Sequence, residues 1–245
     1  MSESTLASIE IANLDLNFLN RKFEKAEPKR ILAWCVANFP TKLVQNSTFN
    51  IDDLVITDLL YRELHPVQPV PVVFVDTLYH FRETLELVDR AQAIYNLDLR
   101  ICKIAGVNSR DEFVARYGAA LWEKDIQRFD YLTKQEPLQQ GLAQLNAMVV
   151  IKACCPNSEK TNTAISVFER DVRGRLQVNP LSCWSRTESW AYAYEYDLIY
   201  NPLHDEGYAR IGDEPLTSKK VTMVPQTDKL ERLRGMLKTP CIYSI

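Results

Sequence analysis

Residues 70–75 read Val-Pro-Val-Val-Phe-Val and are followed by Asp76 and Thr77. A near-continuous run of β-branched residues is typical of a strand that is buried on both faces of a sheet. Asp76 and Thr77 close this strand, and residues 83–95 then have the apolar spacing of an amphipathic helix. The stretch therefore predicts a strand, a polar corner and a helix, which is the repeating unit of a parallel sheet.

The same unit is found on both sides of this stretch. Before it, residues 43–45 form a short apolar run, residues 46–50 a polar turn, and residues 51–64 a helix whose first turn is acidic. Further elements are expected as helices within residues 6–38 and 109–146, strands at 97–104 and 147–151, and a late helix at 187–196. Strands that alternate with helices predict an α/β fold, a mostly parallel sheet with helices on both faces.

In such folds ligands bind at the carboxyl ends of the strands. This rule places residues 46–50, 76–79 and 152–163 along one edge of the sheet. We expect a nucleotide-binding domain over residues 1–216, with the helices of residues 1–40 packed on it. Residues 217–245 are polar and charged, and we expect them to form a flexible C-terminal tail that carries Cys241.

The composition excludes several classes of protein. The 245 residues are 46% hydrophobic, and the net charge of −3 gives no sign of a nucleic-acid surface. No segment is apolar enough to cross a membrane or to act as a secretory signal, so we expect a cytoplasmic protein. The six cysteines include no CxxC pair and no zinc-like spacing, which favours free thiols and no metal site.

Three segments contain side chains that can carry chemistry. Ser47 and Thr48, between a strand and a helix, can hold a phosphate with the backbone N–H groups of their turn, or they can simply cap the helix. Asp76 can bind a ribose or position a loop. The thiol of Cys241 can move between a pocket and an external reductant, or it can be an incidental terminal cysteine. The turn-rich residues 200–215 form either a binding lid or a tight connection.

Four segments in this order resemble the phosphoadenylyl-sulfate (PAPS) reductase family, and in particular its cyanobacterial-type sequences. They are residues 70–84 (Val-Pro-Val-Val-Phe-Val-Asp-Thr-Leu-Tyr-His-Phe-Arg-Glu-Thr), 115–123 (Ala-Arg-Tyr-Gly-Ala-Ala-Leu-Trp-Glu), 134–138 (Lys-Gln-Glu-Pro-Leu) and 201–213 (Asn-Pro-Leu-His-Asp-Glu-Gly-Tyr-Ala-Arg-Ile-Gly-Asp). The resemblance extends over residues 29–217. It implies a fold like the adenine-nucleotide α-hydrolases and the reduction of PAPS to sulfite in sulfate assimilation.

The resemblance also implies a mechanism. The Cys241 thiolate attacks the sulfate sulfur to give an S-sulfonate, and thioredoxin or glutaredoxin releases sulfite by thiol exchange. A homodimer is implied as well. The residues expected to bind the substrate are Ser47, Thr48, Asp76, Thr77, Lys134, Lys152 and Lys160.

No iron–sulfur cluster is expected. The relatives that reduce adenylyl sulfate carry two cysteine pairs as cluster ligands, and these would fall at Phe129 and Asp130 and at Asp213 and Leu216. None of these four residues is a cysteine, and such a cluster needs thiolate ligands. The resemblance therefore points to the cluster-free branch that uses PAPS.

The chain departs from the family where arginines are usual. Residues 152–162 contain Lys152 and Lys160 but no arginine, and the adjacent Cys154 and Cys155 are expected to be free thiols. The tail keeps Cys241 without the glycine and histidine of the family, and Asn50 replaces a glycine. These changes leave a second hypothesis open, a catalytically impaired relative that acts as a nucleotide-binding or interaction protein. A third, a different enzyme on the same fold, is disfavoured because a Ser-Gly-Gly turn is missing.

Overall fold

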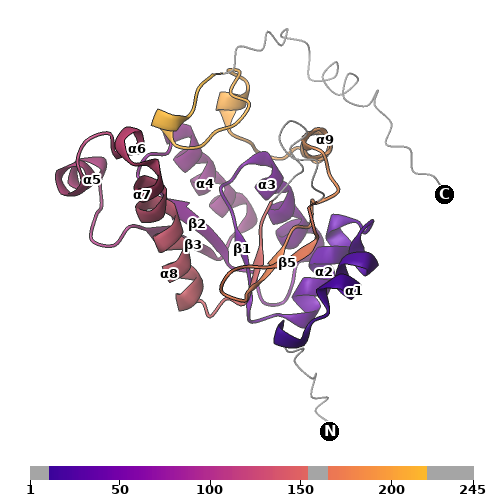
Figure 1. Ribbon diagram of the computed structural model, residues 1–245. Helices are drawn as coiled ribbons and strands as arrows, with labels where there is room; N and C mark the ends of the chain where they lie inside the picture. Colours follow the sequence, from indigo (N-terminus) through magenta and orange to yellow (C-terminus); the bar gives the residue numbers. More distant parts are fainter. Residues whose placement is uncertain (1–10, 154–164, 220–245) are drawn as a thin grey trace.

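A six-stranded sheet forms the centre of the computed structural model, which describes residues 11–153 and 165–219 (Figure 1). Its strand order is β3-β2-β1-β4-β6-β5. All neighbouring strands are parallel except β5 and β6, which are antiparallel. The strands are β1 (Leu43–Asn46), β2 (Val72–Asp76), β3 (Leu99–Lys103), β4 (Val149–Ile151), β5 (Phe168–Arg170) and β6 (Leu176–Val178). The predicted mostly parallel sheet is confirmed.

Helices cover both faces of the sheet (Figure 1). On one face, Val72 and Phe74 pack into a buried cluster with residues of α3 (Ile51–Asp58) and α4 (Arg82–Tyr95). On the other face, Val73 packs against Leu142 of α8 (Glu136–Gln144). Successive side chains of a strand point to opposite faces, so a strand that is apolar at every position needs both layers. The β-branched run of residues 70–75 thus accounts for the three-layer arrangement.

One predicted helix is divided in the structure, and one predicted helical region contains several short helices. The expected helix at 51–64 is α3 followed by a π-helical segment, Leu59–Leu64. The expected helical region at 109–146 contains α5 (Arg110–Tyr117), α6 (Leu121–Lys124), α7 (Ile126–Asp130), a π-helical segment (Tyr131–Gln135) and α8. Gly118 ends α5 at φ 90°, a conformation that glycine adopts at little cost. The late helix is α9 (Arg186–Glu195), which begins with a capping box from Ser185 and Glu188.

The N-terminal helices α1 (Leu16–Phe23) and α2 (Pro28–Asn38) pack on the side of the sheet that ends in β5. The side-chain amide of Asn20 accepts a bond from the Phe168 N–H (2.8 Å) and donates one to the Phe168 carbonyl (2.9 Å). The Trp34 ring packs edge-on against Phe168 at 5.3 Å. The exposed edge that an outer strand would present is therefore covered by α1.

The hairpin of β5 and β6 is not among the strands that the sequence predicts. The carboxylate of Asp171 shapes its turn by accepting bonds from the N–H groups of Arg173 (2.8 Å) and Arg175 (2.9 Å). Gly174 completes the turn at φ 80°. Strands of three residues are too short for an alternating pattern to stand out from the charged residues around them. The hairpin extends the sheet beyond β4.

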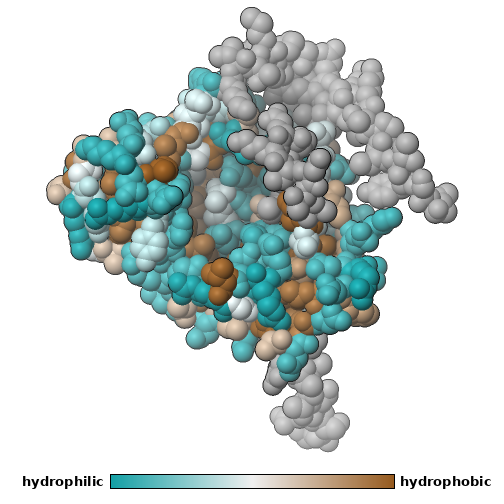
Figure 2. Space-filling model, viewed as in Figure 1, coloured by the Kyte–Doolittle hydropathy of each residue, from teal (hydrophilic) through white to brown (hydrophobic). Residues whose placement is uncertain are grey.

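The surface of the described residues is mainly hydrophilic in the view of Figure 2, and its apolar residues lie in small separate groups. Within residues 11–153 and 165–219, no helix has the length and apolar character that crossing a bilayer requires.

Candidate functional site

The parallel strands bring two predicted segments to one edge of the sheet. Residues 46–50, the β1 turn, begin with the last residue of β1. Residues 76–81, the β2 corner, begin with the last residue of β2 and include the predicted segment 76–79. The two strands are direct neighbours, with Asn46 opposite Val73. Residues 211–217, which we call the closing segment, join this edge through a backbone bridge between His80 and Asp213. These three segments, far apart in the sequence, form the candidate site.

The β1 turn is held by a carboxylate from its own helix. One oxygen of Asp53 accepts bonds from the Thr48 N–H (2.8 Å) and the Thr48 hydroxyl (2.7 Å). The Ser47 hydroxyl accepts a bond from the Phe49 N–H at 3.1 Å. Phe49 is buried and has φ 55°, a left-handed conformation that is costly for a large side chain. Both predicted phosphate-binding hydroxyls thus lie in the turn, where they also stabilise its shape.

Acidic groups dominate the electrostatics of the β1 turn. Burial raises the pKa of Asp53 to about 6, although its bonds from Thr48 act in the opposite direction. One oxygen of the buried Asp52 lies 3.8 Å from the guanidinium of Arg186, the first residue of α9. An anion at this turn would therefore depend on backbone N–H groups and on Arg186 for its positive potential.

The β2 corner begins with Asp76 and contains a second left-handed residue. One oxygen of Asp76 accepts a bond from the Leu78 N–H at 2.9 Å, and the other lies 3.7 Å from the Lys103 ammonium at the end of β3. Leu78 has φ 68°. Strained backbone in both turns at the same edge marks this edge as a candidate functional site.

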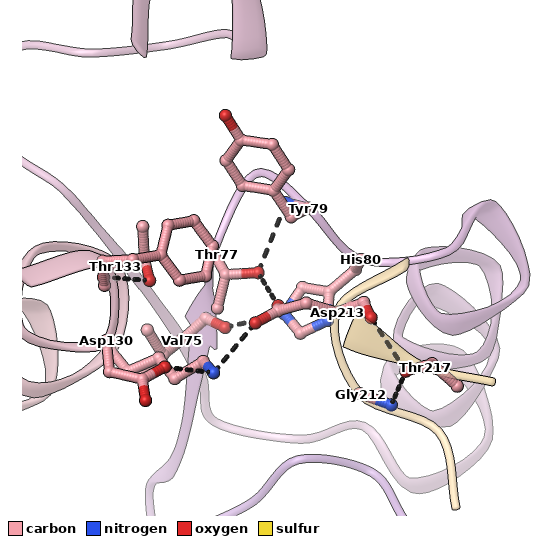
Figure 3. Close-up of polar contacts among 11 residues, drawn as sticks. Val75, Thr77, Tyr79, His80, Asp130, Thr133, Gly212, Asp213 and Thr217 are labelled. Carbon is pink, nitrogen blue, oxygen red and sulfur yellow. Dashed lines mark hydrogen bonds and ion pairs between the residues drawn. The ribbon is translucent and has the colours of Figure 1, made fainter. Parts of the chain in front are cut away.

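Thr77 and Lys134 meet at one buried carboxylate. The Thr77 hydroxyl donates to one oxygen of Asp213 (2.5 Å), and the Lys134 ammonium lies 2.8 Å from the other. The same ammonium lies 2.7 Å from Asp130. Figure 3 shows Thr77, Asp130 and Asp213 converging. The Asp213 side chain is only 1% exposed. Burial lowers the pKa of Lys134, but its bonds to the two carboxylates outweigh this effect and raise it above the ordinary value.

The other predicted cations lie elsewhere. The Lys152 ammonium contacts Glu169 of β5 at 3.0 Å and also bonds to the side-chain oxygen of Gln177 in β6, so its charge is compensated by the hairpin. Lys160 and Cys241 lie outside the described residues, as do Cys154, Cys155 and residues 220–245 of the predicted tail. Ser47, Thr48, Asp76, Thr77 and Lys134 are the predicted residues that the structure places in the three segments or in contact with them.

Three further residues shape the site without having been predicted as part of it. Asp213 connects Thr77 to Lys134, Asp53 holds the β1 turn, and Arg110 donates to carbonyls of the β2 corner. Asp213 and Arg110 bond to site residues that are 30 or more positions away in the chain, so spacing in the sequence gives no sign of these pairs. Asp53 had a visible signal, an acid close to a turn that is rich in hydroxyls.

Comparison with known proteins finds matches that cover most of the chain. A family model described as "Phosphoadenosine phosphosulfate reductase domain" matches residues 42–219. A phosphoadenosine phosphosulfate reductase of Emericella nidulans is 36% identical over 98% of this chain and 78% of its own length. A phosphoadenosine 5'-phosphosulfate reductase of Gloeobacter violaceus is 34% identical over 92% of each chain.

Solved structures are also similar to this chain. A crystal structure of PAPS reductase from Candida auris, in a phosphate complex, has a TM-score of 0.78 and 33% identity. It covers 86% of this chain and 100% of its own. Yeast FAD synthetase is similar in fold alone, with a TM-score of 0.55 and 15% identity over 83% of this chain and 69% of its own. These neighbours confirm the predicted adenine-nucleotide α-hydrolase-like fold.

Proposed function

Because the chain belongs to the phosphoadenosine phosphosulfate reductase family, we propose that it reduces PAPS to sulfite and adenosine 3',5'-bisphosphate in the cytoplasm. The observation that carries this proposal is the family match over residues 42–219. That range includes the β1 turn, the β2 corner and the closing segment, the three parts of the candidate site.

The proposed chemistry has two steps. First, the Cys241 thiolate attacks the sulfur of the substrate, the bond between sulfur and the bridging oxygen breaks, and adenosine 3',5'-bisphosphate leaves. The product is a cysteine S-sulfonate. Second, a thiolate of thioredoxin or glutaredoxin attacks the Cys241 sulfur, sulfite leaves, and a second thiol resolves the mixed disulfide. Two thiols of the reductant are thereby oxidised to one disulfide while the sulfur is reduced from sulfate to sulfite level.

We assign the substrate-binding role to the predicted residues of the site. Ser47 and Thr48 hold the substrate phosphate at the β1 turn, and Asp76 and Thr77 shape the nucleotide site. The ammonium of Lys134 donates a hydrogen bond to Asp130 and forms an ion pair with Asp213, and we propose that it also contacts a sulfate or phosphate oxygen of the substrate. Lys152 and Lys160 are proposed to add positive potential nearby.

We propose that the protein holds no iron–sulfur cluster. Two of the four positions at which the resemblance places cluster ligands are Asp130 and Asp213, and both carboxylates are bound to Lys134. Among the described residues, no group of three or more histidines, cysteines or acidic residues is arranged to hold a metal ion. We expect the purified protein to contain no iron and no acid-labile sulfide; a stoichiometric cluster in colorimetric analysis would contradict this.

One observation favours a second candidate function, a catalytically impaired relative that binds a nucleotide or another protein. Lys134 and Lys152 are both compensated by carboxylates, so they bring little net positive charge to an anionic substrate. Charge-assisted hydrogen bonds contribute about 1.5–3 kcal/mol each, so a site that lacks several of them has an affinity for its anion that is lower by orders of magnitude.

The two candidates differ in sulfite release from PAPS with reduced thioredoxin. We expect the wild-type protein to release sulfite and Cys241→Ser to release none, because serine cannot form the S-sulfonate. Cys183→Ser is the matched control, since this exposed thiol lies before α9 and bonds to the Glu24 carbonyl of the N-terminal region. If neither the wild type nor the control releases sulfite while both proteins are folded, the result would favour the impaired relative.

The homodimer that the resemblance implies stays a prediction, which analytical ultracentrifugation can test.

A further inference from the structure

The guanidinium of Arg110, the first residue of α5, connects three segments of the chain. Its Nε donates to the Leu78 carbonyl at 2.7 Å, and one Nη donates to the His80 carbonyl at 3.1 Å. The other Nη lies 2.7 Å from the Glu214 carboxylate in the closing segment. One planar group with a fixed set of donors thus joins α5, the β2 corner and the closing segment.

The two carbonyls belong to the most strained part of the corner. Leu78 has φ 68°. Tyr79 is the residue between Leu78 and His80 in the sequence, and its ring lies 5.2 Å from the Arg110 guanidinium. A large side chain leaves the left-handed region unless its surroundings prevent this. The bonds from Arg110 favour the one backbone conformation in which both carbonyls face the guanidinium.

The same conformation sets the buried contacts of the site. The Tyr79 carbonyl accepts a bond from the Glu214 N–H at 2.7 Å, and the Thr77 hydroxyl donates to Asp213. The closing segment is therefore joined to the corner on the side of Lys134 and again on the side of Arg110. Arg110 acts on this conformation through its two bonds to the carbonyls of the corner, so losing those bonds would let the corner relax.

An exposed ion pair alone would not carry this inference. The side chains of Arg110 and Glu214 are 44% and 49% exposed, and pairs of this kind contribute little to stability. The two bonds to backbone carbonyls are different, because they hold main-chain atoms of the candidate site.

We propose that Arg110 is a positioning residue that holds the β2 corner against the closing segment and so sets the affinity of the site for its nucleotide. The identity of the nucleotide rests on the proposed function. The contacts by which Arg110 holds the β2 corner, which we call the Arg110 clamp, do not depend on that function. Nothing in the role requires Arg110 to touch the substrate.

The test compares Arg110→Ala, Arg110→Lys and Glu214→Gln with the matched control Arg116→Ala. Arg116 lies on the same helix, and its guanidinium stacks over Tyr117 at 5.4 Å. Two quantities are measured at a temperature where all proteins are folded. They are the Kd for adenosine 3',5'-bisphosphate, by titration calorimetry, and amide hydrogen exchange in residues 76–81 and 211–217.

We expect Arg110→Ala and Arg110→Lys to weaken binding about tenfold, because each loses at least one charge-assisted bond to the corner. Lysine fails to rescue because one ammonium group cannot reproduce a planar fork. Hydrogen exchange should become faster in both segments. Glu214→Gln keeps the bonds to both carbonyls and should weaken binding by less than about threefold, and Arg116→Ala should change neither quantity.

The proposal is overturned if Arg110→Ala binds within twofold of wild type, if exchange stays local to α5, or if Arg116→Ala has the same effects. A wild-type protein that binds no adenosine bisphosphate would count against the proposed function, not against the clamp. In that case the hydrogen-exchange result decides. Faster exchange in residues 76–81 and 211–217 of Arg110→Ala, but not of Arg116→Ala, supports the Arg110 clamp, and unchanged exchange in Arg110→Ala refutes it.

Discussion

Carboxylates compensate the charges of two lysines that are proposed to bind the substrate. The Lys134 ammonium lies between Asp130 and Asp213. The Lys152 ammonium lies 3.0 Å from Glu169. Asp130 lies four residues before Lys134, whereas Asp213 and Glu169 come from other segments of the chain, so only the first of these pairs has a signal in the local sequence.

Asp53 is another residue whose role depends on its surroundings. It accepts two bonds from Thr48 and is buried, and burial raises its pKa to about 6. An unfolded aspartate has a pKa of about 3.9, so the folded protein binds this proton more tightly than the unfolded chain. The contribution of Asp53 to stability is therefore greatest below pH 4 and is lost as the pH rises through 6.

We predict that Asp53→Asn removes this pH dependence. The amide oxygen of asparagine can still accept the bond from the Thr48 N–H but carries no charge to desolvate. Between pH 4 and pH 7 the free energy of unfolding of wild type should fall relative to that of the variant by up to about 3 kcal/mol. Urea unfolding across this range measures the difference. Asp89→Asn, a change at an exposed position of α4, is the control and should run parallel to wild type. If the free energy of unfolding of Asp53→Asn also ran parallel to that of wild type across this pH range, the pKa of the Asp53 carboxyl would not be perturbed by folding.

Helices and strands depend on close approach as much as on their own residue pattern. Gly141 lies within α8, where a helix would ordinarily favour alanine, and a Cβ at this position would lie 2.2 Å from the sulfur of Cys102 in β3. The same Cβ would lie 3.6 Å from the Cys102 Cβ, which is an ordinary contact. Glycine here lets α8 lie directly on the sheet beside β3.

We predict that Gly141→Ala destabilises the protein by about 1–3 kcal/mol, because the added methyl group overlaps the Cys102 sulfur. Cys102→Ala removes that sulfur, so the double variant should recover most of the loss and also gain helix propensity. Urea unfolding of both single variants and the double variant gives the coupling between the two sites. Additive free energies, with no recovery in the double variant, would mean that the helix moves away from the strand instead.

At the scale of the whole molecule, the strand order explains why distant segments form one site. β1 and β2 are parallel neighbours, so the turns that follow them meet at the same edge. The closing segment reaches this edge from the far end of the described chain and is held there by Thr77, Lys134 and Arg110. On the opposite side of the sheet, the β5–β6 hairpin and α1 close the edge beyond β4.

The fold class and the family follow from the amino-acid sequence alone. Continuous β-branched runs need two apolar layers, alternation with helices needs parallel pairing, and four ordered motifs suffice to identify relatives. It also located the β1 turn and the β2 corner, because polar residues that follow buried strands reach the carboxyl edge.

The contacts that hold the site together depend on the tertiary fold. The pairs of Lys134 with Asp213, of Thr77 with Asp213 and of Arg110 with the β2 corner join residues 30 to 136 positions apart. The hairpin of β5 and β6 also depends on its neighbours, because β6 pairs with the edge of β4 and β5 pairs with β6. The physical reason is the same in both cases: local pattern records burial and backbone preference, whereas the partner of a charge or of an edge strand is chosen by the chain as a whole.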